Sequence, residues 1–175
     1  MRKERRSPES RLHLDDIVRL AEDVILRDGH HIPILLVEGT TDLMVMQLPG
    51  LPDEPELRQA MLFEVGKLVT STASVGRLRQ VFMITEAWLS IEQEGKPVLK
   101  RPSEDPHRKE VLLVAAMYPA TGKQALELRE MIRAANGELM DLRILRPPGH
   151  ATEAVSPLLE AFVAGYETQH RSALR

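Results

Sequence analysis

The sequence contains no cysteine, which excludes disulfide bonds, thiolate metal sites and cysteine nucleophiles. Aromatic residues make up only 3% of the chain, so we do not expect the stacking platforms that bind single-stranded nucleic acid. The apolar runs, such as residues 111–118, are far shorter than the roughly 20 residues that a membrane helix needs. The N-terminus is charged and no apolar stretch follows it, so we expect no secretory signal. These absences predict a soluble, cytoplasmic protein.

Charges of both signs are spread along the chain, and the formal net charge is −3 over 175 residues. Basic residues predominate only in residues 1–11, which we expect to be a solvated tail and not a nucleic-acid-binding arm. Residues 12–170 are long enough for a single domain with a substantial core, and residues 171–175 are expected to be a short second tail. Arginine is far more frequent than lysine, which suggests a bacterial source of the GC-rich or thermophilic kind.

Three segments carry apolar residues at helical spacing and predict amphipathic helices. Leu14–Asp28 is the first, and Gly29 is expected to end it in the left-handed conformation. The second starts after Asp53, whose carboxylate can cap it, and continues to about residue 70. Its expected buried stripe is Leu57, Met61, Val65, Leu68 and Val69. The third starts at Pro157, with Ser156 as its cap.

Other apolar segments are rich in β-forming residues or alternate with a period of two, and they predict strands. Residues 32–37 and 43–48 are expected to form a hairpin around the turn Glu38–Asp42. Both strands are apolar on both faces, so we expect both sides of this part of the sheet to be covered. A meander follows, with strands over residues 81–91, 110–118, 125–133 and 138–145. In the last strand the expected inward set is Met140, Leu142 and Ile144.

Residues 123–135 also have the composition of a helix, which is the alternative to the strand over 125–133. We prefer a strand because Asn136-Gly137 joins two alternating segments, and this dipeptide predicts a type I′ turn, which needs two residues that accept positive φ. The expected fold is therefore α+β: an antiparallel sheet of five or six strands, made of a hairpin plus a meander, with three amphipathic helices. By topology alone this order resembles that of profilin-like and roadblock/longin domains, small modules that mostly bind partners.

Glu86 is the leading candidate for chemistry because it shares a strand face with Phe82, Ile84 and Trp88. A carboxylate surrounded by apolar side chains can serve as a general acid or base. The alternative is that the strand end leaves the sheet, so that Glu86 is exposed or pairs with an arginine.

The polar segment Ser103–Glu110 precedes the most apolar strand, and polar loops on a rigid sheet often carry function. We consider His107 as the acid–base partner of Glu86. Trp88, Arg108 and Lys109 would then bind an anionic ligand. The simpler interpretation of this segment is a solvated connection.

The region around Glu86 also resembles a known group of proteins. Glu86-Ala-Trp-Leu-Ser90, followed by Pro102–Val114, resembles a segment of small bacterial and phage proteins, and the region 86–114 is about a sixth of the chain. The resemblance implies no activity. It implies only that Glu86, Trp88 and the loop belong together.

Other motifs predict neither a metal nor a cofactor. His30-His31 lies near Glu38 and Asp42, but adjacent residues of a strand point to opposite faces, so a helix-to-strand junction explains the pair better. Ala120–Lys123 ends like a P-loop but lacks its first glycine and its final hydroxyl residue. We therefore expect a protein-interaction module that binds a protein partner or forms a homo-oligomer through a sheet edge or helix face. The alternative is a small hydrolase or anion-binding enzyme that uses Glu86 and His107.

Overall fold

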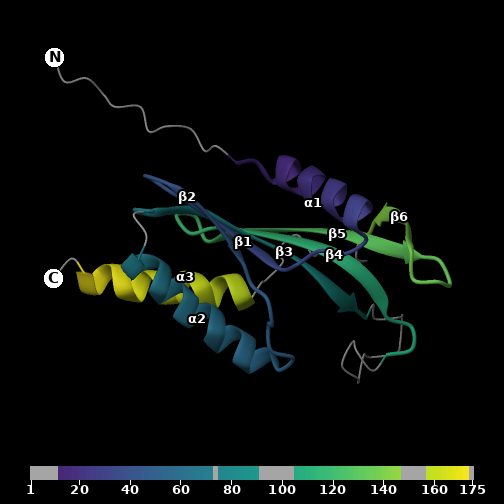
Figure 1. The fold of residues 1–175 in the computed structure, drawn as a ribbon. Coiled ribbons are helices and arrows are strands. Elements are labelled where there is room, and N and C mark those ends of the chain that lie inside the picture. The colour runs from purple at the N-terminus through teal and green to yellow at the C-terminus, as the bar shows by residue number, and fades with distance from the viewer. Residues whose placement is uncertain (1–11, 73–74, 91–104, 147–156, 174–175) are drawn as a thin grey trace, which may run out of the picture.

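The computed structural model describes residues 12–72, 75–90, 105–146 and 157–173 (Figure 1). These residues form three helices and one open, six-stranded antiparallel sheet, which confirms the expected α+β class. The helices are α1 (Leu14–Asp28), α2 (Pro55–Thr72) and α3 (Pro157–Ala173). The strands are β1 (Ile34–Gly39), β2 (Leu43–Gln47), β3 (Leu78–Leu89), β4 (Lys109–Tyr118), β5 (Lys123–Arg133) and β6 (Leu139–Ile144). The expected tail 1–11, most of the loop before β4 and the expected cap Ser156 lie outside the described residues.

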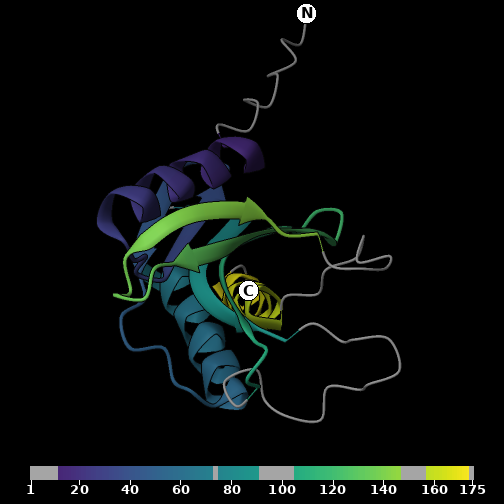
Figure 2. The ribbon, with the colours of Figure 1, turned by 90° about the vertical axis from the view of Figure 1, so that its right-hand side faces the viewer.

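The strand order is β2-β1-β3-β4-β5-β6. Strands β2 and β3 are both antiparallel to β1, so they run parallel to each other and need a crossover, which contains α2. From β3 onward each strand pairs with the next. Figures 1 and 2 show α1 on one side of the sheet and α2 with α3 on the other, so the molecule has three layers.

The sheet separates two apolar cores because successive side chains of a strand point to opposite faces. Val81 and Met83 of β3 pack with α2 and α3, whereas Phe82 and Ile84 pack with α1. This alternation confirms the two faces expected for the strand. Segment 123–133 is a strand, so the helical alternative is wrong. Its pairing with β4 outweighs its helical composition.

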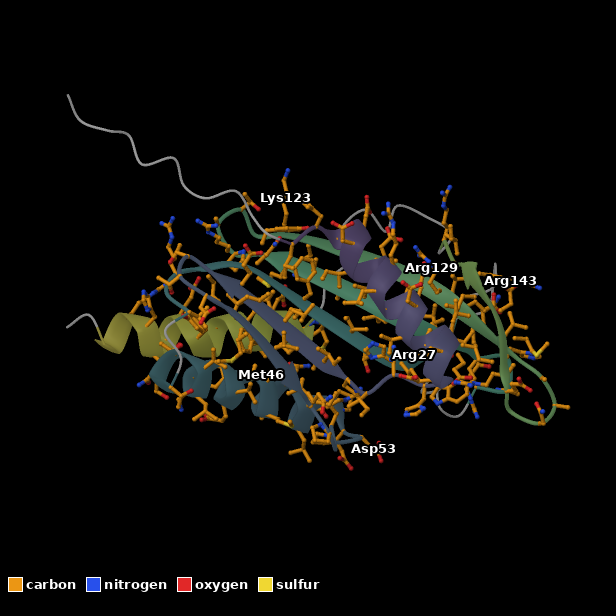
Figure 3. All side chains as sticks on the ribbon, turned by 45° about the horizontal axis from the view of Figure 1, so that its top comes forward. Arg27, Met46, Asp53, Lys123, Arg129 and Arg143 are labelled. Atoms are coloured by element: carbon orange, nitrogen blue, oxygen red, sulfur yellow. The ribbon has the colours of Figure 1, made fainter. Side chains whose placement is uncertain are left out.

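An ion pair also links helix α1 to the sheet. Arg129 of β5 donates hydrogen bonds to Glu22 of α1 and to Glu127 on its own strand, and Figure 3 shows Arg129 beside the helix. Burial lowers the pKa of Arg129, but the hydrogen bonds to Glu127 and Glu22 outweigh it and leave that pKa raised. The arginine therefore stays charged and holds α1 over β5.

The hairpin between β5 and β6 is present, but the expected type I′ turn is wrong. Among the described residues only glycines have positive φ, so Asn136 does not, while Gly137 has a φ of 85°. The N–H of Gly137 donates to the carbonyl of Ala134 at 2.9 Å, and the N–H of Ala134 donates to the carbonyl of Glu138 at 2.9 Å. These bonds indicate a type I turn followed by a glycine bulge, which needs only one left-handed residue.

A β-bulge also changes the side chains that β6 turns inward. The register between β5 and β6 shifts, and Met140 is left as the extra residue between the pairs made by Leu139 and Asp141. Leu142 packs on the α1 core as expected, but Met140 and Ile144 are 62% and 63% exposed. Their expected inward placement is wrong. The bulge displaces Met140, and no other part of the chain that the structure describes covers the edge of the sheet at Ile144.

The expected covering of both faces is correct for β1 and half correct for β2, where Met44 and Met46 pack against the core beneath α2 and α3 but the opposite face is mostly exposed. Strand β1 is buried along nearly its whole length. Strand β2 is an edge strand, and its Val45 is 59% exposed. A side chain on an edge strand lacks a neighbouring strand on one side, which the apolar pattern alone did not indicate.

The buried stripe of α2 is set by its contact with α3 and matches the expected one only in part, since Val69 is buried and Met61 and Val65 pack against the core. Leu57 and Leu68 are 55% and 59% exposed. The buried residues are Leu62, Gly66 and Val69. Gly66 therefore lies in the interface, at a position that the expected stripe did not include.

Candidate functional site

Glu86 lies on the α1 side of the sheet, where β3 pairs it with Leu112 of β4. Its Oε1 accepts a hydrogen bond from the backbone N–H of His31, and its Oε2 lies 3.9 Å from Nη2 of Arg133. The side chain is 27% exposed. The expected pairing with an arginine is present, but the strand end does not leave the sheet, because β3 pairs with β4 as far as Leu89.

Arg133 is the centre of this polar cluster. Its Nε and Nη2 donate to the two carboxylate oxygens of Glu110 at 2.8 and 3.0 Å, and its Nη1 donates to the carbonyl of Gly29 at 3.0 Å. The hydrogen bond to Glu110 raises the pKa of Arg133 above its ordinary value. The cluster joins β3, β4, β5 and the residue that follows α1. Its geometry suits a structural clamp, because both carboxylates already have partners.

Trp88 and Arg108, two of the expected ligand-binding residues, are in contact. The guanidinium carbon of Arg108 lies 4.4 Å from the centre of the Trp88 ring, which is a cation–π distance. Trp88 is 46% exposed, so this pair forms part of the surface. The end of the polar segment and Trp88 therefore do lie together.

Lys109 does not join this pair. It opens β4, and its ammonium donates to Glu130 of β5 at 2.8 Å. Successive residues of β4 point to opposite faces, so Lys109 faces away from the side that carries Trp88 and Glu86. The expected ligand-binding set of Trp88, Arg108 and Lys109 is thus divided between the two faces of the sheet.

His107 is exposed and precedes β4, and its backbone N–H donates to Asp105 at 2.8 Å. Glu86 pairs with Leu112, and the three residues from Leu112 back to Lys109 already span about 10 Å of strand. A catalytic acid and base need hydrogen-bond reach or one bridging water. The acid–base pair of Glu86 and His107 stays a prediction, and the strand register does not favour it.

The two histidines after α1 bond to the backbone. Nδ1 of His30 lies 3.0 Å from the carbonyl oxygen of Asp28, and Nδ1 of the buried His31 lies 2.7 Å from that of Ile32. Within the described ranges of the chain, no three histidine or carboxylate side chains gather as a metal site would require.

A buried polar pair was missed by the sequence reasoning. Glu38 is 2% exposed, and its carboxylate accepts a hydrogen bond at 2.6 Å from the amide of Gln80. The same amide donates to the carbonyl of Leu12, just before α1. The signal that could have found the pair is one acidic residue at the end of a wholly apolar strand.

The β2 edge of the sheet is a further candidate for function, because its backbone groups can pair with another strand. Its ladder with β1 includes the bonds Gly39 N–H to Asp42 O, at 3.0 Å, and Leu48 N–H to Pro33 O, at 2.8 Å. Bonding alternates along an antiparallel pair, so every second residue of β2 turns its N–H and C=O away from β1. These outward residues are Leu43, Val45 and Gln47, and the N–H of Leu43 donates to Oδ1 of the flanking Asp42 at 2.8 Å.

The two edges of the sheet differ in how they are protected against pairing with another strand. Strand β6 carries Asp141, Arg143 and the bulge at Met140, and charges and bulges are features that discourage edge-to-edge association. Figure 3 shows Arg143 at this edge. Strand β2, Leu43-Met-Val-Met-Gln47, contains no charge and no proline. Its ladder with β1 has no register shift along these five residues.

No family model, curated protein or solved structure matches the chain. The resemblance to small bacterial and phage proteins and the topological analogy with profilin-like and roadblock/longin domains therefore stay predictions. No helix in the described parts of the chain is long and apolar enough to cross a membrane.

Proposed function

We propose that this protein is a cytoplasmic, bacterial interaction module that self-associates through its β2 edge to form a homo-oligomer. The observation that carries the proposal is the contrast between the two sheet edges. Strand β6 has charges and a bulge, whereas β2 is uncharged and regular, and its central Val45 is 59% exposed. An unprotected edge is a template for pairing with another chain.

A second copy of this chain is the partner that β2 suits best. A strand can pair with its own symmetry copy in antiparallel orientation about a two-fold axis. An axis at Val45 places Val45 opposite its copy and Leu43 opposite Gln47, so the residues whose backbone groups point outward face one another. No charged side chain would oppose another of the same sign. The two sheets would become continuous across the dimer.

The expected affinity is modest. Burying a valine side chain contributes roughly 1.5–3 kcal/mol, whereas loss of translational and rotational freedom opposes association by at least about 4 kcal/mol. Backbone hydrogen bonds and the flanking methionines must supply the remainder. We therefore expect a dissociation constant in the micromolar range and not below it.

The test is the oligomeric state as a function of concentration, measured by sedimentation velocity. The wild type should pass from monomer to dimer between about 1 μM and 1 mM, the range that corresponds to such an affinity. Val45→Lys should remain monomeric because it places like charges face to face at the axis. Ile144→Lys is the matched control, since Ile144 is 63% exposed on the other edge strand, and it should associate like the wild type.

Two results would overturn the proposal. One is a wild-type protein that stays monomeric throughout this range. The other is equal loss of association in Val45→Lys and Ile144→Lys. Circular dichroism melts of both variants keep the comparison valid, because both positions are exposed and neither substitution is expected to unfold the chain.

The alternative function, a small hydrolase or anion-binding enzyme built on Glu86 and His107, has the contact between Arg108 and Trp88 as its one supporting observation. The partners of Glu86 weigh against it. It is the second candidate, and the stability of Glu86→Ala separates a structural role of Glu86 from a chemical one.

A further inference from the structure

An open hollow of about 430 Å³ lies between the second half of α3, the start of β3 and the turn that joins β4 to β5. Leu78, Pro119 and Ala120 form an apolar part of its lining. Ala120 belongs to the turn that ends like a P-loop in the sequence but lacks the residues for that role. The volume lies in the range of sites that hold small organic ligands.

Arg77 brings a positive charge to this hollow. Its backbone is fixed, because its N–H donates to Oγ1 of Thr40 at 3.1 Å and its carbonyl accepts the N–H of Thr40 at 2.9 Å. Within the described residues, no hydrogen bond or ion pair engages its guanidinium. In a chain of net charge −3, an arginine whose guanidinium has no partner among the described residues favours an anionic ligand at this hollow.

Arg171 and Glu167 line the same hollow and pair with each other. Their contact, Nη2 to Oε2, is 3.1 Å, and the two side chains are 77% and 47% exposed. Exposed pairs of this kind contribute little stability. Arg171 can therefore leave Glu167 for a ligand with a stronger negative charge at small cost.

The aromatic side of the hollow is held in place. The rings of Tyr166 and His170 are stacked with centres 6.0 Å apart, and the Tyr166 hydroxyl donates to the carbonyl of Gly76 next to Arg77. The Tyr166 ring is therefore held in place before any ligand arrives, with His170 beside it. Ordered side chains reduce the entropy lost on binding.

We propose that this hollow binds a compact organic anion. Arg77, with Arg171 and His170, holds a phosphate or carboxylate group, and the apolar part of the ligand lies against Leu78 and Pro119. The bidentate geometry of arginine suits either anion. The hollow shares no residue with β2, so this inference and the proposed self-association stand or fall separately.

The experiment is a ¹H–¹⁵N NMR titration with three probes: phenyl phosphate, benzoate and inorganic phosphate. Phenyl phosphate or benzoate should shift the amides of Arg77, Ala120 and His170 in a saturable way. Arg77→Gln should weaken binding about tenfold or more, the effect of one charge-assisted hydrogen bond. Glu167→Gln should strengthen binding, because it frees Arg171. Arg143→Gln on β6 is the matched control and should leave the affinity unchanged.

Three results would overturn the inference. One is the absence of saturable shifts at the hollow with all three probes at millimolar concentration. Another is equal affinity for phenyl phosphate and inorganic phosphate, which would remove the role of the apolar lining. The third is an equal effect of Arg77→Gln and Arg143→Gln. Preference for phenyl phosphate over benzoate would assign a phosphate ligand and the reverse a carboxylate, and either result supports the proposal.

Discussion

Gly66 of α2 and Gly165 of α3 lie at a close contact between the two helices. A Cβ atom on Gly66 would lie 2.1 Å from the carbonyl oxygen of Phe162, and one on Gly165 would lie 2.0 Å from that of Phe63. Both obstacles are backbone atoms and cannot rotate away. Thr70 reinforces the contact by placing its hydroxyl 3.0 Å from the carbonyl of Tyr166. The α2–α3 layer therefore depends on two positions without side chains.

Gly165→Ala should destabilise the protein by about 3 kcal/mol, the upper part of the usual range for overpacking. Helix propensity alone predicts the opposite sign, since alanine is favoured over glycine by about 1 kcal/mol in a helix. Urea denaturation gives the free energy of unfolding. The control is Ala164→Gly at the exposed neighbouring position, where propensity alone acts and the loss should be about 1 kcal/mol. A more stable Gly165→Ala variant would contradict the close contact.

Glu86→Ala should destabilise the fold by about 1–3 kcal/mol, because it leaves the N–H of His31 without its acceptor. Glu86→Gln should lose less, since its amide oxygen can still accept that hydrogen bond. Equilibrium denaturation of both variants tests the structural role. Glu64→Ala serves as the control, because the pair of Glu64 with Lys67 is exposed and should contribute less than about 1 kcal/mol. Unchanged stability of Glu86→Ala would leave this carboxylate free for chemistry.

Arg108→Ala should expose more of the indole of Trp88, which is already 46% exposed, to solvent. Trp88 is the single tryptophan of the chain, so fluorescence reports on this site alone. Acrylamide quenching should become stronger. The free energy of unfolding should fall by roughly 0.5–1 kcal/mol, the typical contribution of an exposed cation–π contact. Arg143→Ala, with the same loss of charge on β6, should leave quenching unchanged. Equal quenching in the two variants would show that Arg108 does not cover the ring.

Alkaline titration should show both tyrosines ionising above their ordinary range. Burial raises the pKa of Tyr118 and of Tyr166, and the chain contains no other tyrosine. The folded pKa lies above the unfolded value of about 10, so the stabilising effect is complete below pH 10 and is lost as pH rises through the folded pKa. Absorbance at 295 nm follows ionisation, and denaturation between pH 9 and 12 follows stability.

Tyr166→Phe is the companion variant for this titration. It removes one ionising group, so its stability should fall less steeply with alkaline pH than that of the wild type. It also removes the hydrogen bond to Gly76, so it should be less stable at neutral pH by about 1 kcal/mol. Tyrosinate absorbance that is half complete at or below pH 10 in the folded protein would contradict the raised values.

Much of the fold could be predicted because the relevant interactions are local in the sequence. The helix Leu14–Asp28 and its cap Gly29 were predicted from helical spacing and from the need for a left-handed residue, and Gly29 has a φ of 77°. The two faces of β3 follow from a period of two. The choice of strand for segment 123–133 was correct because the turn after it joins two alternating segments.

The candidate site was predicted only in part. Proximity of Trp88 to Arg108 was expected from the resemblance of their segments, and it is present. The partners of Glu86 were not predictable, because His31 and Arg133 are distant in the chain and only strand register and the packing of α1 bring them together. The face on which Lys109 lies was equally decided by register.

The sequence by itself therefore determined the helices, the strands and the α+β class, since capping and periodicity act over a few residues. Tertiary structure alone decided which faces of these helices and strands are buried and which are exposed. The bulge at Met140 shifted the face of β6, and the approach of Gly66 to the backbone of α3 left Leu57 and Leu68 outside the buried stripe of α2. Placement of β2 at an edge left Val45 exposed. Each of these outcomes depends on contacts between elements, and no local pattern of residues encodes them.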